Sequence, residues 1–436
     1  MPTAAAPTAV CGGTPALRVV MISLHTSPLA QAGRGDAGGL NVYVNALSRS
    51  LRAAGVSVDI VTTSSEEPGP SAALAGGDGV TFLPDGRRVH TLGVPADRLR
   101  GQDGRPDKNR LVEHVEDLAG RAEASLARHA EPGEQTVLHS HYWISGLAAL
   151  RLAGEGRPLI HTMHTIGEIK RERDPATRED PRRDSAEAKI AAGAALLTAN
   201  TQQEADDLGR LFSVPPQRIG LVRPGVDLSV FHPPETLGGE DPRADLEGRP
   251  LRLTFAGRLQ PHKGPQVAIE ALGAFRRMMP EVGLELTVAG QQSGADALDV
   301  EGLAAAAGVS DLVRTAPPMP HEQLADLFRA SDAVLVPSYS ESFGLVALEA
   351  MACGTPVLAH DVGGLSELVR HRRTGRLIGS LDPQEWAEQM RWLVLHRRAW
   401  SRYSATAAAA AQSYAWASTA NAALSLYRSL APARVG

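Results

Sequence analysis

Short apolar runs alternate with helix-length segments along almost the whole chain. Apolar runs at 17–23 and 56–61 enclose a stretch with helical spacing at 42–51, and the second half repeats the alternation from 251 to 336. This order is typical of α/β proteins, in which crossover helices join parallel strands. Because 436 residues exceed one ordinary core, we expect two parallel-sheet domains of the doubly wound type.

The domain boundaries follow from shifts in composition. We expect a disordered tail at 1–16, an N-terminal domain at 17–230, and a linker at 231–250, where proline, glycine and acidic residues gather. A second domain is predicted at 251–412. The last helical segment, 413–436, is expected to pack back on the N-terminal domain.

Bulk properties exclude several classes of function. The net charge of −5 and the pI near 6.3 do not suggest a general nucleic-acid binder. The chain has two cysteines, Cys11 and Cys353, so we expect a reducing compartment and no disulfide framework. No secretory signal and no apolar run of about 18 residues occur, so we expect a cytoplasmic protein without a membrane span.

One stretch, 333–352, combines an apolar run, a polar loop and a helix. Glu341 lies in the loop, and Glu349 lies about two turns into the helix. Free backbone N–H groups at Gly344 and Leu345 would suit a diphosphate. The flanking carboxylates would suit sugar hydroxyls. The alternative is an ordinary strand–helix turn with two solvated glutamates.

A second loop carries two cations. Arg258 directly follows the apolar run at 251–255, and Lys263 directly precedes a helix. Because ligands of such sheets bind beyond the carboxyl ends of the strands, these cations could hold a leaving diphosphate and stabilise its charge. The alternative is a basic turn with surface ion pairs. The charged segment 168–187 is expected to be a solvated loop, in which one or two arginines could face a ligand.

Other chemistries find less support. The glycine-rich loop before Asn41 reads G-R-G-D-A-G-G, which allows backbone N–H groups to approach a phosphate but is no dinucleotide fingerprint. No kinase-type phosphate loop and no Asp-x-Asp pair occur. Zinc is conceivable at four histidines that alternate along two apolar runs, but hydrogen bonding is the favoured interpretation for His139, His141, His161 and His164.

Taken together, these motifs resemble the retaining family-four glycosyltransferases of the GT-B fold, which have two Rossmann-like domains and an active site in the cleft between them. The resemblance rests on G-R-L-Q-P-H-K-G-P, S-E-S-F-G-L-V-A-L-E-A and V-R-P-G-V-D. In the first half, the chain is similar to the branch that acts on inositol 3-phosphate in mycothiol biosynthesis. That similarity rests on G-D-A-G-G-L-N-V-Y-V, L-H-S-H-Y-W-I-S-G and I-H-T-M-H-T, and it extends over about residues 17–430.

This resemblance implies transfer of N-acetylglucosamine from UDP-N-acetylglucosamine to 1D-myo-inositol 3-phosphate with retention of configuration, by a homodimer. No obvious carboxylate nucleophile accompanies the motifs, which favours front-face attack assisted by the donor diphosphate. One alternative is a related transferase with another acceptor, such as phosphatidylinositol or a sugar phosphate. Another is a binding protein for UDP-sugars that does not catalyse transfer.

The resemblance also implies roles for individual residues. Catalytic roles fall to His164, Arg258, Lys263 and Glu341. The donor would be bound by Gln31, Ala32, Gly39, Arg258, Lys263, Met319, Glu341, Gly344, Leu345 and Glu349. The acceptor would be bound by His25, Asp36, Ala37, Gly38, Gly39, Leu40, Asn41, Lys108, Tyr142, Thr165 and Arg183, with Arg182 as the alternative to Arg183. The chemistry needs no cofactor, but a peripheral magnesium ion is implied near Phe328, Arg329, Ser331 and Thr355.

Overall fold

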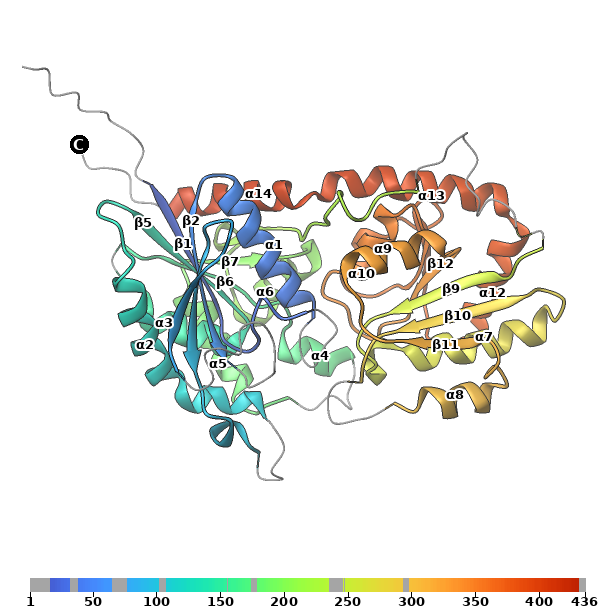
Figure 1. Ribbon diagram of the computed structural model, residues 1–436, viewed down its shortest axis with the longest axis horizontal. Coiled ribbons are helices and arrows are strands. Elements are labelled where there is room, and N and C mark those ends of the chain that lie inside the picture. Colours follow the sequence, from blue (N-terminus) through green and yellow to red (C-terminus); the bar gives the residue numbers. More distant parts are fainter. Residues whose placement is uncertain are drawn as a thin grey trace, which may run out of the picture.

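Two separate parallel sheets account for the alternation of strands and helices (Figure 1). The computed structural model describes residues 16–31, 38–64, 77–101, 107–154, 156–173, 179–234, 246, 248–292 and 298–430. Each sheet is covered by helices, and each has its own buried hydrophobic side chains. The expected α/β architecture is therefore confirmed.

The N-terminal sheet has eight strands in the order β3-β4-β2-β1-β5-β6-β7-β8, and the antiparallel β3 lies at one edge. Its strands are β1 (Leu17–Ser23), β2 (Ser57–Ser64), β3 (Gly79–Phe82), β4 (Arg88–Gly93), β5 (Gln135–His141), β6 (Leu159–Thr162), β7 (Leu196–Ala199) and β8 (Ile219–Leu221). The helices are α1 (Gly39–Ala53), α2 (Val115–Ala127), α3 (Trp143–Leu152), α4 (Gly167–Arg173), α5 (Arg183–Gly193) and α6 (Gln202–Phe212), with 3-10 turns at η2 (Ala96–Leu99), η3 (Lys108–His114) and η4 (Pro216–Arg218).

The charged segment 168–187 differs from its prediction. It is not simply a solvated loop, because α4 and the start of α5 lie within it. Arg183 at the start of α5 is fully buried, and Glu187 one turn later is buried as well. The two opposite charges can be buried because they pair with each other. The number of charged residues in a segment does not reveal such pairing, so the sequence did not predict it.

The C-terminal sheet has six parallel strands in the order β11-β10-β9-β12-β13-β14. Its strands are β9 (Leu251–Ala256), β10 (Leu284–Ala289), β11 (Val313–Ala316), β12 (Ala333–Val336), β13 (Val357–His360) and β14 (Gly375–Ile378). The helices are α7 (Pro265–Met278), α8 (Val300–Ala307), α9 (His321–Ala330), α10 (Leu345–Ala352), α11 (Gly364–Leu368), α12 (Pro383–Leu395) and α13 (Arg397–Ala411), with 3-10 turns at η5 (Pro261–Lys263) and η6 (Gln412–Tyr414). None of the helices within the described ranges is long and apolar enough to cross a membrane.

The last helix, α14 (Trp416–Leu430), returns to the N-terminal domain (Figure 1). Its buried side chains belong to the same hydrophobic cluster as Val44 and Leu47 of α1. The hydroxyl of Tyr427 is also 2.7 Å from Nδ1 of His139 in β5. The chain therefore passes from the first domain to the second and ends on the first.

A carboxylate joins the two domains directly. Glu367 of α11 accepts hydrogen bonds from the backbone N–H groups of Gln202 and Gln203, at distances of 3.0 and 2.8 Å. These N–H groups open α6, where the helix dipole favours a negative charge. A second contact, 3.4 Å long, joins Nη1 of Arg173 to the hydroxyl of Ser340. These contacts hold the two domains face to face.

If α14 is part of the N-terminal core, Leu424→Ala should lower the free energy of unfolding of that domain by about 2–5 kcal/mol, because it leaves a cavity under a buried helix. Guanidinium denaturation measures this loss. Ser425→Ala, on the exposed side of the same helix, is the control. Equal stability of the two variants would contradict this packing.

Candidate active site

A cavity of about 460 Å³ lies between the two domains. This volume is within the range of small-molecule sites. The N-terminal domain contributes His25, Gly38, Gly39, Leu40, Asn41, Tyr142, His164, Thr165 and Lys170 to its lining. The C-terminal domain contributes Arg258, Lys263, Met319, Glu341, Gly344, Leu345 and Glu349. Most of the predicted site residues therefore meet in one cavity, although the sequence places them up to about 300 positions apart.

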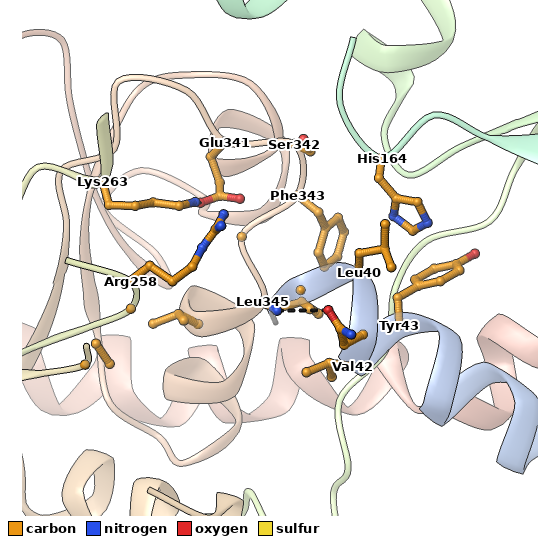
Figure 2. Close-up of a pocket in the computed structure, with 18 of the residues that line it drawn as sticks. Leu40, Val42, Tyr43, His164, Arg258, Lys263, Glu341, Ser342, Phe343 and Leu345 are labelled. Carbon is orange, nitrogen blue, oxygen red and sulfur yellow. Dashed lines mark hydrogen bonds and ion pairs between the residues drawn. The ribbon is translucent and has the colours of Figure 1, made fainter. Parts of the chain in front are cut away.

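Arg258 and Lys263 face Glu341 from the loop that follows β9 (Figure 2). Nζ of Lys263 is 2.8 Å from Oε2 of Glu341, and both side chains are largely buried. The carboxylate orients the ammonium group, while Arg258 adds a second positive charge beside it. This pair of cations gives the C-terminal side of the cavity a surface suited to anions.

The position of these loops depends on Gly264. Its φ is +76°, and a Cβ atom built there would lie 2.0 Å from the carbonyl oxygen of Pro337. The N–H of Tyr339 also donates to the carbonyl of His262 at 2.8 Å. Only glycine permits both this conformation and this approach. The loop after β9 is thereby packed against the loop after β12, which carries Glu341.

Two helices begin at the cavity from opposite sides. Gly344, with φ of +99°, precedes α10, and Gly38 precedes α1. A Cβ atom at Gly39 would lie 3.4 Å from Cδ1 of Leu345, so the two helix starts nearly touch. Helix starts present free N–H groups and partial positive charge. Together with the two cations, they favour an anionic ligand such as a diphosphate.

Asn41 fixes the N-terminal helix start. Its Oδ1 accepts hydrogen bonds from the N–H of Gly38 at 3.0 Å and from the hydroxyl of Thr26 at 3.1 Å, and its Nδ2 donates to the carbonyl of Ser27 at 2.5 Å. The side chain is 1% exposed. The Asn41 side chain therefore holds the backbone at the cavity wall. Its amide is engaged there, whereas the resemblance implied that Asn41 contacts the acceptor.

Burial alone changes the charge state of Glu349. It raises the pKa of this carboxyl to about 8. The group is therefore mostly protonated at neutral pH and can donate as well as accept hydrogen bonds. A neutral carboxyl in the cavity lining adds no negative charge that would repel an anion, and it remains able to bind ligand hydroxyls.

The acceptor side is built around Tyr142. Its backbone has φ of +72° where β5 meets α3, and its ring lies 4.9 Å from the ring of His25. The guanidinium of Arg183 lies over the Tyr142 ring at 4.9 Å from its centroid. Burial raises the pKa of the Tyr142 hydroxyl, which therefore stays protonated at neutral pH. The hydroxyl is a donor available to an anionic group.

Arg183 lies behind the cavity wall. It makes five hydrogen bonds, which match its five N–H groups: one to Glu187, one to Glu179, one to the Tyr142 hydroxyl, and two to Thr165, one each to its carbonyl and its hydroxyl. It is 0% exposed and is not among the residues that line the cavity. Arg183 therefore orients Tyr142 and Thr165 in this arrangement. The neighbouring Arg182 points to Asp180 and Glu113, and its side chain is 45% exposed.

Lys170 is a cation that the sequence interpretation missed. It extends from α4, lines the cavity, and pairs with Glu179. Its position within a stretch of mixed charges hides it, because neighbouring residues of both signs predict a solvated surface. The one sequence feature that could have pointed to Lys170 is its distance from the loop that carries Thr165. Gly167 begins the helix after that loop, and Lys170 lies one helical turn later.

His164 has φ of +61° and faces the cavity close to Tyr43 (Figure 2). Its Nε2 is 3.0 Å from Nδ1 of His141. Burial lowers the pKa of His164 to about 3, so the ring is neutral at neutral pH. A neutral ring next to the cavity can exchange hydrogen bonds with a sugar without adding charge.

The other histidines make hydrogen bonds. Nδ1 of His161 is 2.7 Å from the Ser140 hydroxyl, and Nε2 of His139 is 2.8 Å from the Thr162 hydroxyl. In the part of the chain that the structure describes, no three His, Cys, Asp or Glu side chains are grouped to hold a metal ion. These contacts agree with the hydrogen-bonding role expected for the four histidines.

The residues implied for magnesium offer a poor set of ligands. The Thr355 hydroxyl donates to the carbonyl of Phe328 at 2.6 Å, and the Ser331 hydroxyl donates to the carbonyl of Leu327 at 2.7 Å. Arg329 would bring a positive charge to the ion. Magnesium prefers carboxylates and six oxygen ligands, so these residues do not fit it well.

The remaining predicted residues lie elsewhere. Lys108 opens η3 and is not among the residues lining the cavity, and Gln31 precedes a segment outside the described residues. Ala32, Asp36 and Ala37 lie in that segment. Residues not anticipated also line the cavity, among them Thr26, Gln260, His262, Pro317, Pro318, Ser342 and Phe343.

Comparisons with known proteins identify the class. Residues 37–230 match the family model described as Glycosyltransferase Family 4, and residues 240–410 match Glycosyl transferases group 1. Sucrose-phosphate synthase from Thermosynechococcus elongatus has a similar structure, with a TM-score of 0.76 and 29% identity over 95% of this chain and 99% of that one. With two facing Rossmann-like domains and a cationic cleft, the chain is an enzyme: a glycosyltransferase of the GT-B fold.

Relatives of nearly equal length identify the family. The D-inositol 3-phosphate glycosyltransferase of Paenarthrobacter aurescens (strain TC1) is 39% identical over 94% of this chain and 97% of that protein. That of Stackebrandtia nassauensis is 41% identical over 94% of this chain and 91% of that protein. The chain belongs to the family of D-inositol 3-phosphate glycosyltransferases. The resemblance on which the sequence interpretation relied is confirmed.

The raised pKa of Glu349 has a measurable effect on stability. Its carboxyl has a pKa near 4.5 in the unfolded chain and about 8 in the folded one, so the folded state binds the extra proton between these values. Stability should therefore fall as pH rises through this window. Glu349→Gln should flatten this fall in melting temperature between about pH 4.5 and 8.

Melting curves of both proteins across that range give the comparison. Glu204, whose pKa burial raises to about 7, should leave part of the slope in the variant. Parallel curves for the variant and the natural protein would contradict a neutral Glu349.

Proposed function

We propose that this enzyme transfers N-acetylglucosamine from UDP-N-acetylglucosamine to 1D-myo-inositol 3-phosphate with retention of configuration, which is the first step of mycothiol biosynthesis. The observation that supports this most is the pairing of two charged sites in one cavity. Arg258, Lys263 and a helix start suit a diphosphate on one side, and Lys170 and Tyr142 suit a phosphorylated acceptor on the other. The names of the relatives support inositol 3-phosphate as that acceptor.

On the donor side, Arg258 and Lys263 would bind the diphosphate and stabilise the charge that develops as UDP leaves. The N–H groups after Gly344 would contact the same phosphates. Glu341 would bind the sugar hydroxyls, Glu349 the ribose and the Met319 backbone the uracil. A solved structure of a similar fold, Anabaena HepE with UDP and glucose, has a TM-score of 0.68 and 18% identity.

On the acceptor side, Tyr142, Thr165 and Lys170 would hold the phosphate, with His25 and the start of α1 against the inositol ring. Lys108 belongs to this set by resemblance, although it lies outside the cavity lining. Before the acceptor binds, Arg183 would orient Tyr142 and Thr165, because its N–H groups donate hydrogen bonds to these two residues.

The charge states of the cavity support front-face attack. The described carboxylates that line it are Glu341, which pairs with Lys263, and Glu349, which burial keeps neutral. Neither is a free nucleophile for a covalent glycosyl intermediate. The acceptor hydroxyl would attack the anomeric carbon on the face that UDP leaves, as the bond from that carbon to the diphosphate oxygen breaks. That oxygen would take the acceptor proton, and neutral His164 would position the sugar.

We propose that the transfer requires no cofactor, that the reaction takes place in the cytoplasm and that the enzyme is a homodimer. The Cys353 thiol is buried and donates to the carbonyl of Ala325 at 3.7 Å, and a thiol in the reduced form suits a reducing compartment. The dimer rests on the resemblance.

Release of UDP from UDP-N-acetylglucosamine tests the function. Turnover should require inositol 3-phosphate, and free inositol should be a far poorer acceptor because it lacks the group that the cations bind. Activity with phosphatidylinositol or a sugar phosphate in its place would indicate the related transferases. Binding of UDP without turnover of any acceptor would indicate a binding protein.

Lys170→Ala should raise the KM for inositol 3-phosphate by about tenfold or more, because a charge-assisted hydrogen bond is lost. The affinity for UDP should not change. Lys189→Ala, which removes an exposed cation from α5 in the same region, is the matched control. Steady-state kinetics with both substrates measures the effect. A larger loss of affinity for UDP than for inositol 3-phosphate would contradict the placement of Lys170 on the acceptor side of the cavity.

A further inference from the structure

Two cations on the acceptor side, Lys170 in the cavity lining and Arg183 behind it, already share an anion. Glu179 bridges them: its Oε2 accepts a hydrogen bond from Nη1 of Arg183 at 2.6 Å, and its Oε1 pairs with Nζ of Lys170. The Glu179 side chain is 9% exposed. A carboxylate that spans two cations in this way has the geometry and charge sign with which a phosphate would bind the same groups.

The ionised form of Glu179 is favoured. Burial alone would raise the pKa of its carboxyl, but Arg183 and Lys170 outweigh this effect and hold the pKa below its usual value. The carboxylate is therefore negative at neutral pH. It neutralises the cations that the acceptor phosphate would need.

The local charges are balanced before any ligand arrives. Arg183 and Lys170 supply two positive charges, and the carboxyls of Glu179 and Glu187 are paired with them. Burial raises the pKa of Glu187, while the ion pair with Arg183 and the N–H of Gly167 favour its ionised form. A phosphate monoester would add about 1.5–2 negative charges. Binding beside an unmoved Glu179 would therefore place three anions around two cations, which repulsion disfavours.

Glu187 and Glu179 differ in their distance from the cavity. Glu187 is 1% exposed, contacts Nε of Arg183 at 2.6 Å and also accepts a hydrogen bond from the N–H of Gly167, so it belongs to the frame of the site. Glu179 contacts the outer cation, Lys170, which lines the cavity. Of the two, Glu179 is the carboxylate whose place a ligand in the cavity can take.

We propose that Glu179 is an internal competitor for the acceptor phosphate. Its carboxylate leaves Arg183 and Lys170 when a phosphorylated acceptor binds, and the phosphate takes over these two contacts. This inference rests on the proposed function, since it concerns the same acceptor site. It assigns Glu179 the role of setting the affinity for the acceptor phosphate, and it explains how the fully engaged Arg183 becomes available to that phosphate.

The test is the isosteric variant Glu179→Gln, which keeps the shape of the side chain and removes its charge. The affinity for inositol 3-phosphate, measured by calorimetric titration, should increase by about tenfold because the phosphate no longer displaces an ion pair. The affinities for UDP and for free inositol should not change. Asp180→Asn is the matched control, since Asp180 is equally buried and also paired with an arginine, Arg182, whose side chain is exposed.

Several outcomes would overturn the inference. These are an unchanged or weaker affinity of Glu179→Gln for inositol 3-phosphate, an equal gain in Asp180→Asn, or an equal gain for free inositol. Melting temperatures show whether each variant is folded. If Glu179→Gln does not fold, Glu179→Asp, which shortens the reach to the cations, should give a smaller gain of the same sign, and the lack of one would overturn the inference.

Failure of the proposed function has a different signature. In that case the natural protein would neither bind inositol 3-phosphate nor turn it over. Inorganic phosphate is then the probe: it should raise the melting temperature of Glu179→Gln more than that of the natural protein or of Asp180→Asn. Equal shifts in the three proteins would overturn the role of Glu179 independently of the acceptor.

Discussion

The near contact between the starts of α1 and α10 is the constraint around which the site is built. Gly39 and Leu345 come from different domains, yet a Cβ atom at Gly39 would lie 3.4 Å from Cδ1 of Leu345, which is van der Waals contact. The approach aims free N–H groups from both helices at one cavity, where Arg258 and Lys263 add full charges. This concentration of positive charge explains why a nucleotide diphosphate, and not a neutral sugar alone, suits the cleft.

The interdomain geometry has its own supports. Glu367 caps α6 of the opposite domain, and α14 returns the chain to the domain where it began. In the proposed reaction, the donor site and the acceptor site lie on separate domains that meet at the transferred sugar. In that arrangement the C-terminal domain would bind the anionic leaving group and the N-terminal domain would bind the acceptor.

Sequence reasoning succeeded where topology decides position. Lys263 and Glu341 follow β9 and β12, which are neighbours in the sheet, so their loops must meet at one edge. Reasoning from sequence was weaker where burial decides the role. Nothing in the segment 168–187 distinguishes the buried Arg183 from the exposed Arg182, and mixed charges conceal Lys170. Likewise, the neutral state of Glu349 follows from its burial and not from its spacing.

The central claim is that one cleft binds a UDP-sugar on the C-terminal domain and a phosphorylated polyol on the N-terminal domain. A crystal structure with UDP and inositol 3-phosphate bound together tests it most directly. We expect the diphosphate against Arg258, Lys263 and the start of α10, and the acceptor phosphate within reach of Lys170, Tyr142 and Thr165. A phosphate bound away from these side chains, or a diphosphate on the N-terminal domain alone, would contradict it.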